Sequence, residues 1–261
     1  MPLATAAPST PPPLEPETVR ALEERAFNAW PARQSVLQAG WVFRLSGGFT
    51  KRANSVNALE SNAPFNGIRA AAEALYARHG LPTVFRISPL AHPDADQELA
   101  EAGYAHFDPS LVMAAGLDAA QAHAGVQIHT SPTAAWLNGF AAANGVQAKN
   151  HPIHHAMVYA IALPCAFATL NDGAGQTIGF GLAVLERGAI GLYDIVVDPA
   201  LRGQGHGRTL VVALLQWGRD MGAGSAYLQV RAVNQVARRL YAGLGFREVY
   251  PYHYRTPPAK A

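Results

Sequence analysis

The residues best suited to chemistry form the segment RGQGHG, residues 202–207, between the apolar run LYDIVVDPAL and the helical-looking run RTLVVALLQW. A strand that ends in a glycine loop and leads into a helix directs several backbone N–H groups to one point. The partial positive charge of the helix N-terminus adds to them. Arg202 and Arg208 can add charge-assisted hydrogen bonds. The segment therefore predicts an anion site, usually a phosphate site, although ordinary turns share its composition.

Regular elements surround this loop. The C-terminal part predicts a short strand, two helices and three strands before the loop, and then helix, strand, helix and strand after it. The predicted elements after the loop are 208–221, 226–231, 235–243 and 247–255. The N-terminal part predicts a helix over 15–30, turn-linked strands, and then helix, strand, helix and strand up to residue 117. This order indicates an α+β chain with mostly antiparallel strands flanked by helices.

The combination of DPALRGQGHG, a helix, YLQVRAVN and ARRLYAGLGF resembles the acetyl-CoA-dependent N-acetyltransferase superfamily known as GNAT. Arg202, Gly205 and Gly207 match the pyrophosphate loop of that superfamily. Asn234 and Tyr241 match its asparagine after the fifth strand and its tyrosine in the following helix. The resemblance covers residues 126–255 and is most specific over 190–250.

The resemblance implies a binding site for acetyl-CoA as co-substrate, without a metal. The strand before the loop separates from the next strand, and free backbone groups then bind the pantetheine arm while loop amides bind the pyrophosphate. The implied binding residues are Ile195, Val196, Val197, Arg202, Gly203, Gln204, Gly205, His206, Gly207, Arg208 and Asn234. A strand amide near Val196 stabilises the oxyanion, and Tyr241 protonates the departing thiolate as general acid. The alternative for Tyr241 is a core tyrosine on a helix face.

The general base is where the chain departs from the family. The strand YLQVRAVN is most similar to that of the ribosomal-protein alanine acetyltransferases, which carry a Glu base where this chain has Gln229. An amide cannot accept a proton at neutral pH, which argues against that particular activity. Asp194 is a possible base, because alternation places it on the opposite strand face from Ile195, but it can equally serve as a hydrogen-bond acceptor. Glu186 is a weaker candidate.

Two further polar groups invite a functional interpretation. The segment HPIHH contains His151, His154 and His155, which can share a helix face and either bind a metal, contact substrate or lie in solvent. No Cys or carboxylate follows at ligand spacing, so no metal site is predicted. In the first half, the cationic and amide side chains of one segment could select an acceptor that carries a carboxylate or phosphate, or could lie on a solvated hairpin face. They are Arg44, Lys51, Arg52 and Asn54.

The two halves of the chain align at an offset of 142 residues, the separation of Tyr104 and Phe246. This offset places ESNAPF under RGQGHG, and Leu99 under Tyr241, so the first half lacks the anion loop and the acid. The sequence thus predicts a tandem GNAT fold with two mixed, mostly antiparallel sheets in α/β/α layers. The expected segments are a disordered Pro-rich tail (1–13), a degenerate GNAT-like domain (14–118), a linker (119–125), a catalytic domain (126–255) and a tail (256–261).

Composition narrows the partners. Charged residues are only 15% of the chain and the formal net charge is +2, which does not favour nucleic acid. Apolar runs are too short to span a membrane. We therefore expect a cytoplasmic monomer or homodimer that transfers an acetyl group from acetyl-CoA to a primary amine, either a small molecule or a peptide N-terminus. The alternative is a non-catalytic acyl-CoA-binding sensor.

Overall fold

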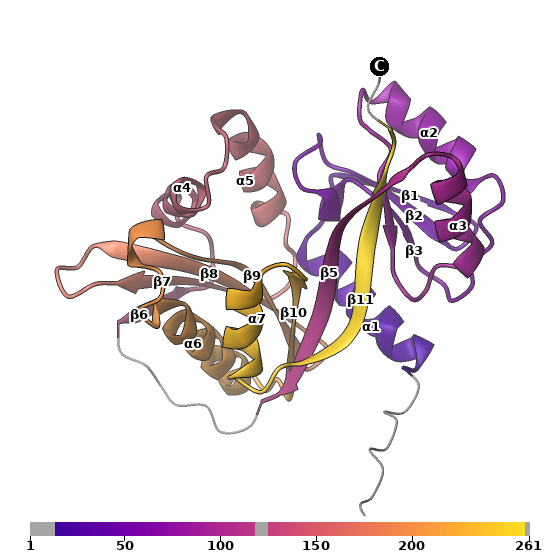
Figure 1. Cartoon of the computed structure of the whole chain (residues 1–261). Coiled ribbons are helices and arrows are strands. Elements are labelled where there is room, and N and C mark those ends of the chain that lie inside the picture. The colour runs from indigo at the N-terminus through magenta and orange to yellow at the C-terminus, as the bar shows by residue number, and fades with distance from the viewer. Residues whose placement is uncertain (1–13, 118–124, 259–261) are drawn as a thin grey trace, which may run out of the picture.

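The fold is described by a computed structural model that covers residues 14–117 and 125–258. Its centre is one continuous sheet of eleven strands, in the order β1-β2-β3-β4-β11-β5-β10-β9-β8-β7-β6 (Figure 1). The two separate sheets expected from the sequence are therefore wrong. The expected N-terminal tail, nearly all of the expected linker and the last three residues lie outside the described residues.

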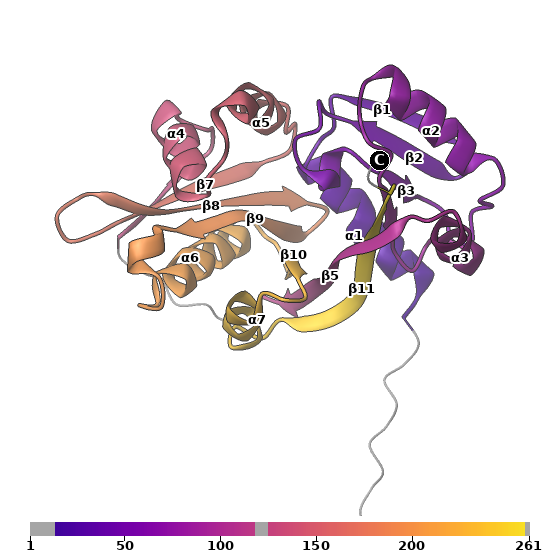
Figure 2. The same cartoon turned by 45° about the horizontal axis from the view of Figure 1, so that its top comes forward.

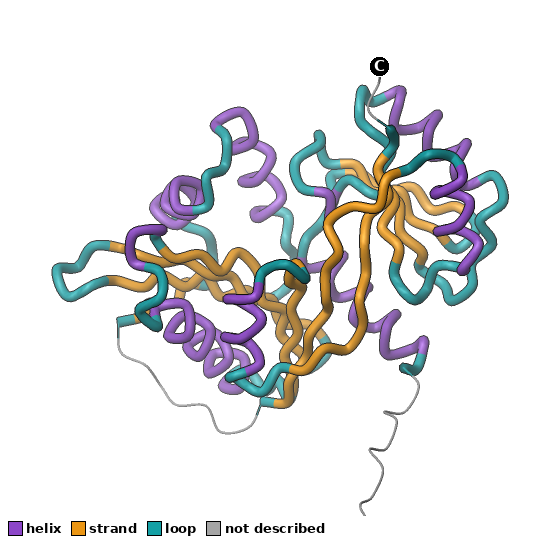
Figure 3. The backbone as a smooth tube through the Cα atoms, viewed as in Figure 1, coloured by secondary structure: helices purple, strands orange, loops and turns teal. Residues whose placement is uncertain are grey.

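The strands of the sheet are β1 Gln34–Gln38, β2 Trp41–Leu45, β3 Val56–Ala58, β4 Phe85–Ile87, β5 Ala105–Gly116, β6 Val126–His129, β7 Cys165–Asn171, β8 Thr177–Glu186, β9 Ala189–Val197, β10 Ser225–Arg231 and β11 Arg247–Thr256. The α-helices are α1 Pro16–Ala29, α2 Ile68–Arg78, α3 Pro93–Glu101, α4 Ala134–Ala143, α5 His151–Tyr159, α6 His206–Asp220 and α7 Gln235–Ala242. Short 3-10 turns occur at Lys51–Ala53 (η1), Ala148–Asn150 (η2) and Pro199–Leu201 (η3). The predicted α+β class, with most neighbouring strands antiparallel, agrees with this architecture (Figure 3).

Helices cover both faces of the C-terminal strands. Figure 2 shows α4 and α5 on one face of β7–β9, with α6 and α7 on the other. Because side chains alternate along a strand, β10 supplies both cores. Leu228 packs with α6 and α7, whereas Tyr227 packs with the residues of α1, α4 and α5. The face that carries α4 and α5 is therefore also the face reached by α1 from the N-terminal half.

The two halves exchange strands at the centre of the sheet. β5 lies between β10 and β11 and is antiparallel to both, and β11 in turn lies between β4 and β5. Figure 1 shows these two long strands side by side at the junction of the halves. Because each half completes its sheet with a strand of the other, hydrogen bonding runs unbroken across the molecule. This exchange is why one sheet forms where two were expected.

The offset of 142 residues fits only part of the fold. It carries β4 onto β10, α3 onto α7 and the start of β5 onto the start of β11. It fails before α2, because Val56 pairs with Phe85 whereas the residue that pairs with Tyr227 is Gly191, 135 positions after Val56. The connection between β3 and α2 is longer than that between β9 and α6, so the two loops align only approximately.

A buried polar cluster joins the halves where β4 meets β11. Arg86 of β4 forms an ion pair with Glu23 of α1, with Nη2 donating to Oε1 at 2.9 Å. The Tyr250 hydroxyl of β11 donates to the same carboxylate oxygen at 2.6 Å. A buried charge without its partner costs several kcal/mol. The cluster therefore ties α1 and β4 to the strand contributed by the C-terminal half.

No helix in the described ranges is both long enough and apolar enough to cross a bilayer.

Candidate active site

The central opening of the sheet lies between β9 and β10. These neighbouring parallel strands are paired from Ala189 and Ser225 up to Leu192 and Leu228. Beyond that point β9 pairs only with β8 and β10 only with β5, so the two strands separate. The separation leaves the end of β9, residues 193–197, facing a gap rather than a neighbouring strand. Such a gap exposes backbone N–H and C=O groups that an extended ligand can pair with.

A β-bulge in β9 marks the edge of this gap. Asp194 and Ile195 together lie opposite the single residue Gly181 of β8, and the φ angle of Asp194 is +50°. A bulge bends the strand and redirects its side chains. Ile195 packs with the core beneath α6, while the Asp194 side chain lies on the α5 face. The two residues thus point to opposite faces, as the sequence predicts, but the bulge contributes to this arrangement.

The glycine loop follows the separated end of β9 and leads directly into α6. Gly205 is the N-cap of α6 with a φ of +88°, and Gly203 has a φ of +79°. A Cβ built at either position meets no atom within 4 Å, so the loop faces open space. Among the described residues, the backbone amides from Gly203 to Arg208 have no hydrogen-bond acceptor. The loop therefore has the free amides and the open surface that an anion site requires.

The remaining loop residues have structural duties as well. Arg202 Nε donates to the Val197 carbonyl at 3.1 Å and so braces the loop against the end of β9. A Cβ at Gly207 would lie 3.3 Å from Leu240 Cδ1, so this glycine lets α7 pack closely against the start of α6. Gln204 is exposed and His206 is half-buried.

Tyr241 and Asn234 lie on α7, which packs beside the start of α6. Tyr241 is 9% exposed, its ring centroid is 5.8 Å from that of Phe246, and burial raises its pKa to about 12. A phenol with this pKa stays protonated at neutral pH, the state a proton donor needs. Asn234 is the N-cap of α7, and its Oδ1 accepts the Ala237 amide at 3.1 Å. Sequence reasoning missed this capping role.

Asp194 is paired with a histidine. His154 Nε2 lies 3.2 Å from Asp194 Oδ2, and the exposed fractions of the two side chains are 0% and 7%. The sequence singled out both residues but did not predict their contact, because forty positions separate them and α5 and β9 are brought together only by the fold. The arrangement joins a carboxylate at the strand gap to a fully buried imidazole.

An aromatic cluster encloses His154. The centroid distances from its ring are 4.9 Å to Phe140, 5.7 Å to Phe49 and 6.0 Å to Trp30. Its Nδ1 is buried and has no hydrogen-bond partner among the described residues. The aromatic rings fix the plane of the imidazole, and the imidazole in turn fixes the Asp194 carboxylate.

The other histidines of HPIHH do not join this pair. His151 Nε2 hydrogen-bonds with the Val146 carbonyl at 3.0 Å, and the His151 ring stacks on that of His155 at 6.1 Å. Burial lowers the pKa of His155. Within residues 14–117 and 125–258, no three His, Cys, Asp or Glu side chains gather into a group that could hold a metal ion.

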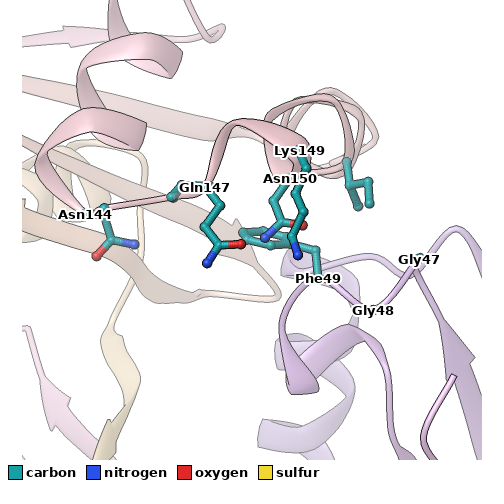
Figure 4. Close-up of a pocket in the computed structure, with 10 residues that line it drawn as sticks. Gly47, Gly48, Phe49, Asn144, Gln147, Lys149 and Asn150 are labelled. Carbon is teal, nitrogen blue, oxygen red and sulfur yellow. The ribbon is translucent and has the colours of Figure 1, made fainter.

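Two hollows lie near the gap on the α4–α5 side. The larger, about 660 Å³, separates the α4–α5 connection from the loop Gly47–Phe49. Figure 4 shows Gln147 and Asn150 on the first of these segments and Phe49 on the second. The smaller, about 280 Å³, lies between η1 and strands β5, β10 and β11, and Gln229 lines it. Gln229 Oε1 accepts the Tyr252 hydroxyl at 3.3 Å.

Glu186 is remote from the gap. It pairs with Ala189 at the first residue of β9, the opposite end of that strand from the bulge. Its carboxylate accepts hydrogen bonds from Asn28 at 3.1 and 3.2 Å. This position favours a structural role.

The polar residues of the first half divide into two groups. Arg44 is buried, donates to the carbonyls of Phe27 and Trp30, and has its pKa lowered by burial to about 10. Asn54 is also buried and binds backbone groups of the turn at 46–50. Lys51 and Arg52 instead line the smaller cavity. Only this second group can meet a ligand.

The loop of the first half that corresponds to the glycine loop is filled by side chains. Phe65 is 5% exposed and packs 5.3 Å from Trp41, whose Nε1 donates to the Pro64 carbonyl. Leu99, at the position of Tyr241, is fully buried. This half has neither an open amide loop nor a proton donor at the matching position.

Comparison with known proteins agrees with this geometry. Residues 17–255 match the family described as "Probable histone acetyltransferase Rv0428c C-terminal". The chain is 28% identical over 246 residues to the uncharacterized N-acetyltransferase YobR of Bacillus subtilis, covering 92% of this chain and 98% of that protein. It is 38% identical over 91 residues to the mycothiol acetyltransferase of Thermomonospora curvata, covering 34% and 31% of the two chains.

A solved structure shares the fold over nearly the whole length. The GCN5-related N-acetyltransferase of Kribbella flavida superposes with a TM-score of 0.69 at 14% identity, covering 94% of this chain and 96% of that one. The family match, which spans most of the chain, agrees with the separated strands and the glycine loop. The chain therefore belongs to this acetyltransferase family within the GNAT superfamily of N-acetyltransferases.

Proposed function

We propose that the protein transfers the acetyl group of acetyl-CoA to a primary amine, by direct attack of the amine while both substrates are bound. The observation that carries this proposal is the separation of β9 from β10 immediately before the open amide loop of α6. An extended pantetheine arm fits the free edge of β9, and the pyrophosphate fits the amides from Gly203 to Arg208. Arg202, Arg208 and Asn234 lie close to these groups along the chain.

The residues at the gap divide the chemistry between them. Asp194 accepts the proton of the attacking amine, directly or through a water, and His154 holds the carboxylate in position. A backbone amide near Val196 donates to the oxygen that gains negative charge. Tyr241, held in its protonated form by burial, protonates the departing thiolate.

We further propose that the N-terminal half is a degenerate copy of the same fold. Support comes from the offset that carries β4, α3 and β5 onto β10, α7 and β11, and from the reciprocal placement of β5 and β11. The catalytic domain is then 126–255, and residues 14–118 form the degenerate domain. The first half supplies a strand and one wall of the cavity rather than a second centre.

A screen of acceptors tests the proposal. The full chain is incubated with acetyl-CoA and a panel of amines, amino acids and peptides, and free thiol and acetylated product are both measured. Equal amounts of thiol and N-acetyl product are expected with at least one acceptor. Because Gln229 replaces the expected glutamate, the competing function is an acyl-CoA sensor. A sensor would bind acetyl-CoA tightly and acetylate nothing in the panel.

A further inference from the structure

The smaller cavity is lined by three cationic side chains and one carboxylate. The cations are Lys51, Arg52 and Arg231, and the carboxylate is Asp108. Asp108 binds two of the cations, with Oδ2 lying 3.1 Å from Lys51 Nζ and Oδ1 lying 2.5 Å from Arg231 Nε. The positive charge in the cavity therefore exceeds the negative charge, and one cation is left without a carboxylate.

Arg52 is that cation. Among the residues that the structure describes, its guanidinium makes no ion pair, and its contact is with the face of the Trp30 ring, 5.3 Å from the centroid. Stacking on an aromatic ring orients a guanidinium and leaves its in-plane N–H donors free. A carboxylate or phosphate is the group these donors match best.

The cavity adjoins the point at which the sheet opens. Gln229 lines it and directly follows Leu228, the last residue of β10 that pairs with β9. Trp30 links it to the proposed proton acceptor, because the same ring that carries Arg52 packs against His154 at 6.0 Å and against Tyr193 at 6.1 Å. A molecule in this cavity would therefore lie beside the gap, on the face that carries Asp194.

Two features of the lining keep the positive charge in place. Asp108 has a φ of +52°, an uncommon backbone conformation for a residue other than glycine, and it is held there while its carboxylate binds Lys51 and Arg231. Position 229 holds a neutral amide, whereas a glutamate there would add a second carboxylate and repel an anion. The replacement that removes the expected base thus also favours a negatively charged acceptor.

We infer that this cavity binds the anionic group of the acceptor, so that the acceptor is a small amine that also carries a carboxylate or a phosphate. The inference rests on the proposed function, since it names the class of molecule that receives the acetyl group. Arg52 provides the free cation, and Lys51 and Arg231 provide the surrounding positive potential.

Binding of acetylated products tests this inference without requiring turnover. The probes are N-acetylglycine, N-acetyl-β-alanine, N-acetyl-4-aminobutyrate and N-acetylethanolamine phosphate, each compared with its neutral amide or alcohol. Affinity for the full chain is measured by calorimetry in the presence of CoA. We expect at least one anionic probe to bind at least about tenfold more tightly than its neutral partner, and the successful probe distinguishes carboxylate from phosphate.

Substitutions then assign the preference to the cavity. Arg52→Gln is expected to bring the ratio of the two affinities close to one, Arg52→Lys to retain most of it, and the exposed control Arg78→Gln to leave it unchanged. Equal affinity for anionic and neutral probes in the unaltered chain overturns the inference, as does an unchanged ratio in Arg52→Gln. Because thiol release is measured separately, a chain that transfers acetyl groups without this preference refutes only the inference. A chain that shows the preference but transfers nothing refutes only the proposed function.

Discussion

His154 of α5 and Asp194 of β9 form a buried pair, with Nε2 and Oδ2 3.2 Å apart, at the bulge where the central strands separate. The imidazole is enclosed by aromatic rings, so the carboxylate is held by a rigid partner. If Asp194 accepts the amine proton, as proposed, removing its charge while keeping its shape should stop the reaction without unfolding the site.

The first prediction concerns Asp194→Asn. Asparagine tolerates a positive φ nearly as well as aspartate, so the bulge should persist. Turnover should fall by about 10²–10⁴-fold, the usual contribution of a positioned base, with acetyl-CoA affinity unchanged. Steady-state kinetics and calorimetry measure the two effects, and Asp172→Asn, in the turn between β7 and β8, serves as a control. Unchanged turnover in Asp194→Asn would make this carboxylate purely structural.

The second prediction concerns the amide loop. Gly205→Asp places a carboxylate where the pyrophosphate is proposed to bind, and like-charge repulsion should weaken acetyl-CoA binding by at least about thirtyfold, or ~2 kcal/mol. Aspartate at a φ of +88° is also strained. Gly222→Asp is the matched control, because Gly222 has a φ of +85° and equally open surroundings at the other end of α6. Similar loss of binding in both variants would assign the effect to strain and contradict the proposed pyrophosphate site.

The third prediction is that acetyl-CoA binds once per chain. In the first half, Phe65 and Pro64 occupy the loop that corresponds to the amide loop, and Trp41 bonds to the Pro64 carbonyl. Calorimetric titration of the full chain should therefore give a stoichiometry near one. Two equivalent sites would refute the proposed degeneracy of the first half.

The fourth prediction is that the halves unfold together. A fragment of residues 120–261 lacks β5, which pairs with β10 on one side and with β11 on the other. Such a fragment exposes unpaired strand edges and should aggregate or remain unfolded. The full chain should show one cooperative transition in urea. Adding residues 1–117 to the fragment should restore solubility, whereas a soluble, active monomer of 120–261 alone would contradict the prediction.

The sequence predicted the elements around the amide loop closely. The helices expected over 208–221 and 235–243 are α6 and α7, and the strand between them is β10. Glycine spacing and apolar periodicity are local signals, so they survive without knowledge of the rest of the fold. The positive φ angles of Gly203 and Gly205 agree with the reason for expecting glycine there.

Features that depend on distant contacts could not be predicted. The single sheet arises because β5 and β11 pair across the halves, and neither strand carries a local mark of its partner. The same limit hid the contact of His154 with Asp194 and the split between buried Arg44 and cavity-lining Arg52. In each case residue types suggested chemistry, but only tertiary packing determined which side chains meet.

The most direct measurement of the central claim is the turnover of Tyr241→Phe at matched acetyl-CoA occupancy. The substitution removes one hydroxyl and keeps the ring that packs against Phe246, so folding and acetyl-CoA affinity should be unchanged. Loss of the proton donor should lower kcat by about 10²–10⁴-fold. Because burial holds the pKa of Tyr241 at about 12, the unaltered chain should lose no activity from this group between pH 7 and pH 10. Full turnover in Tyr241→Phe would contradict the assigned acid, and an unaltered chain that binds acetyl-CoA but acetylates no amine would contradict the enzyme itself.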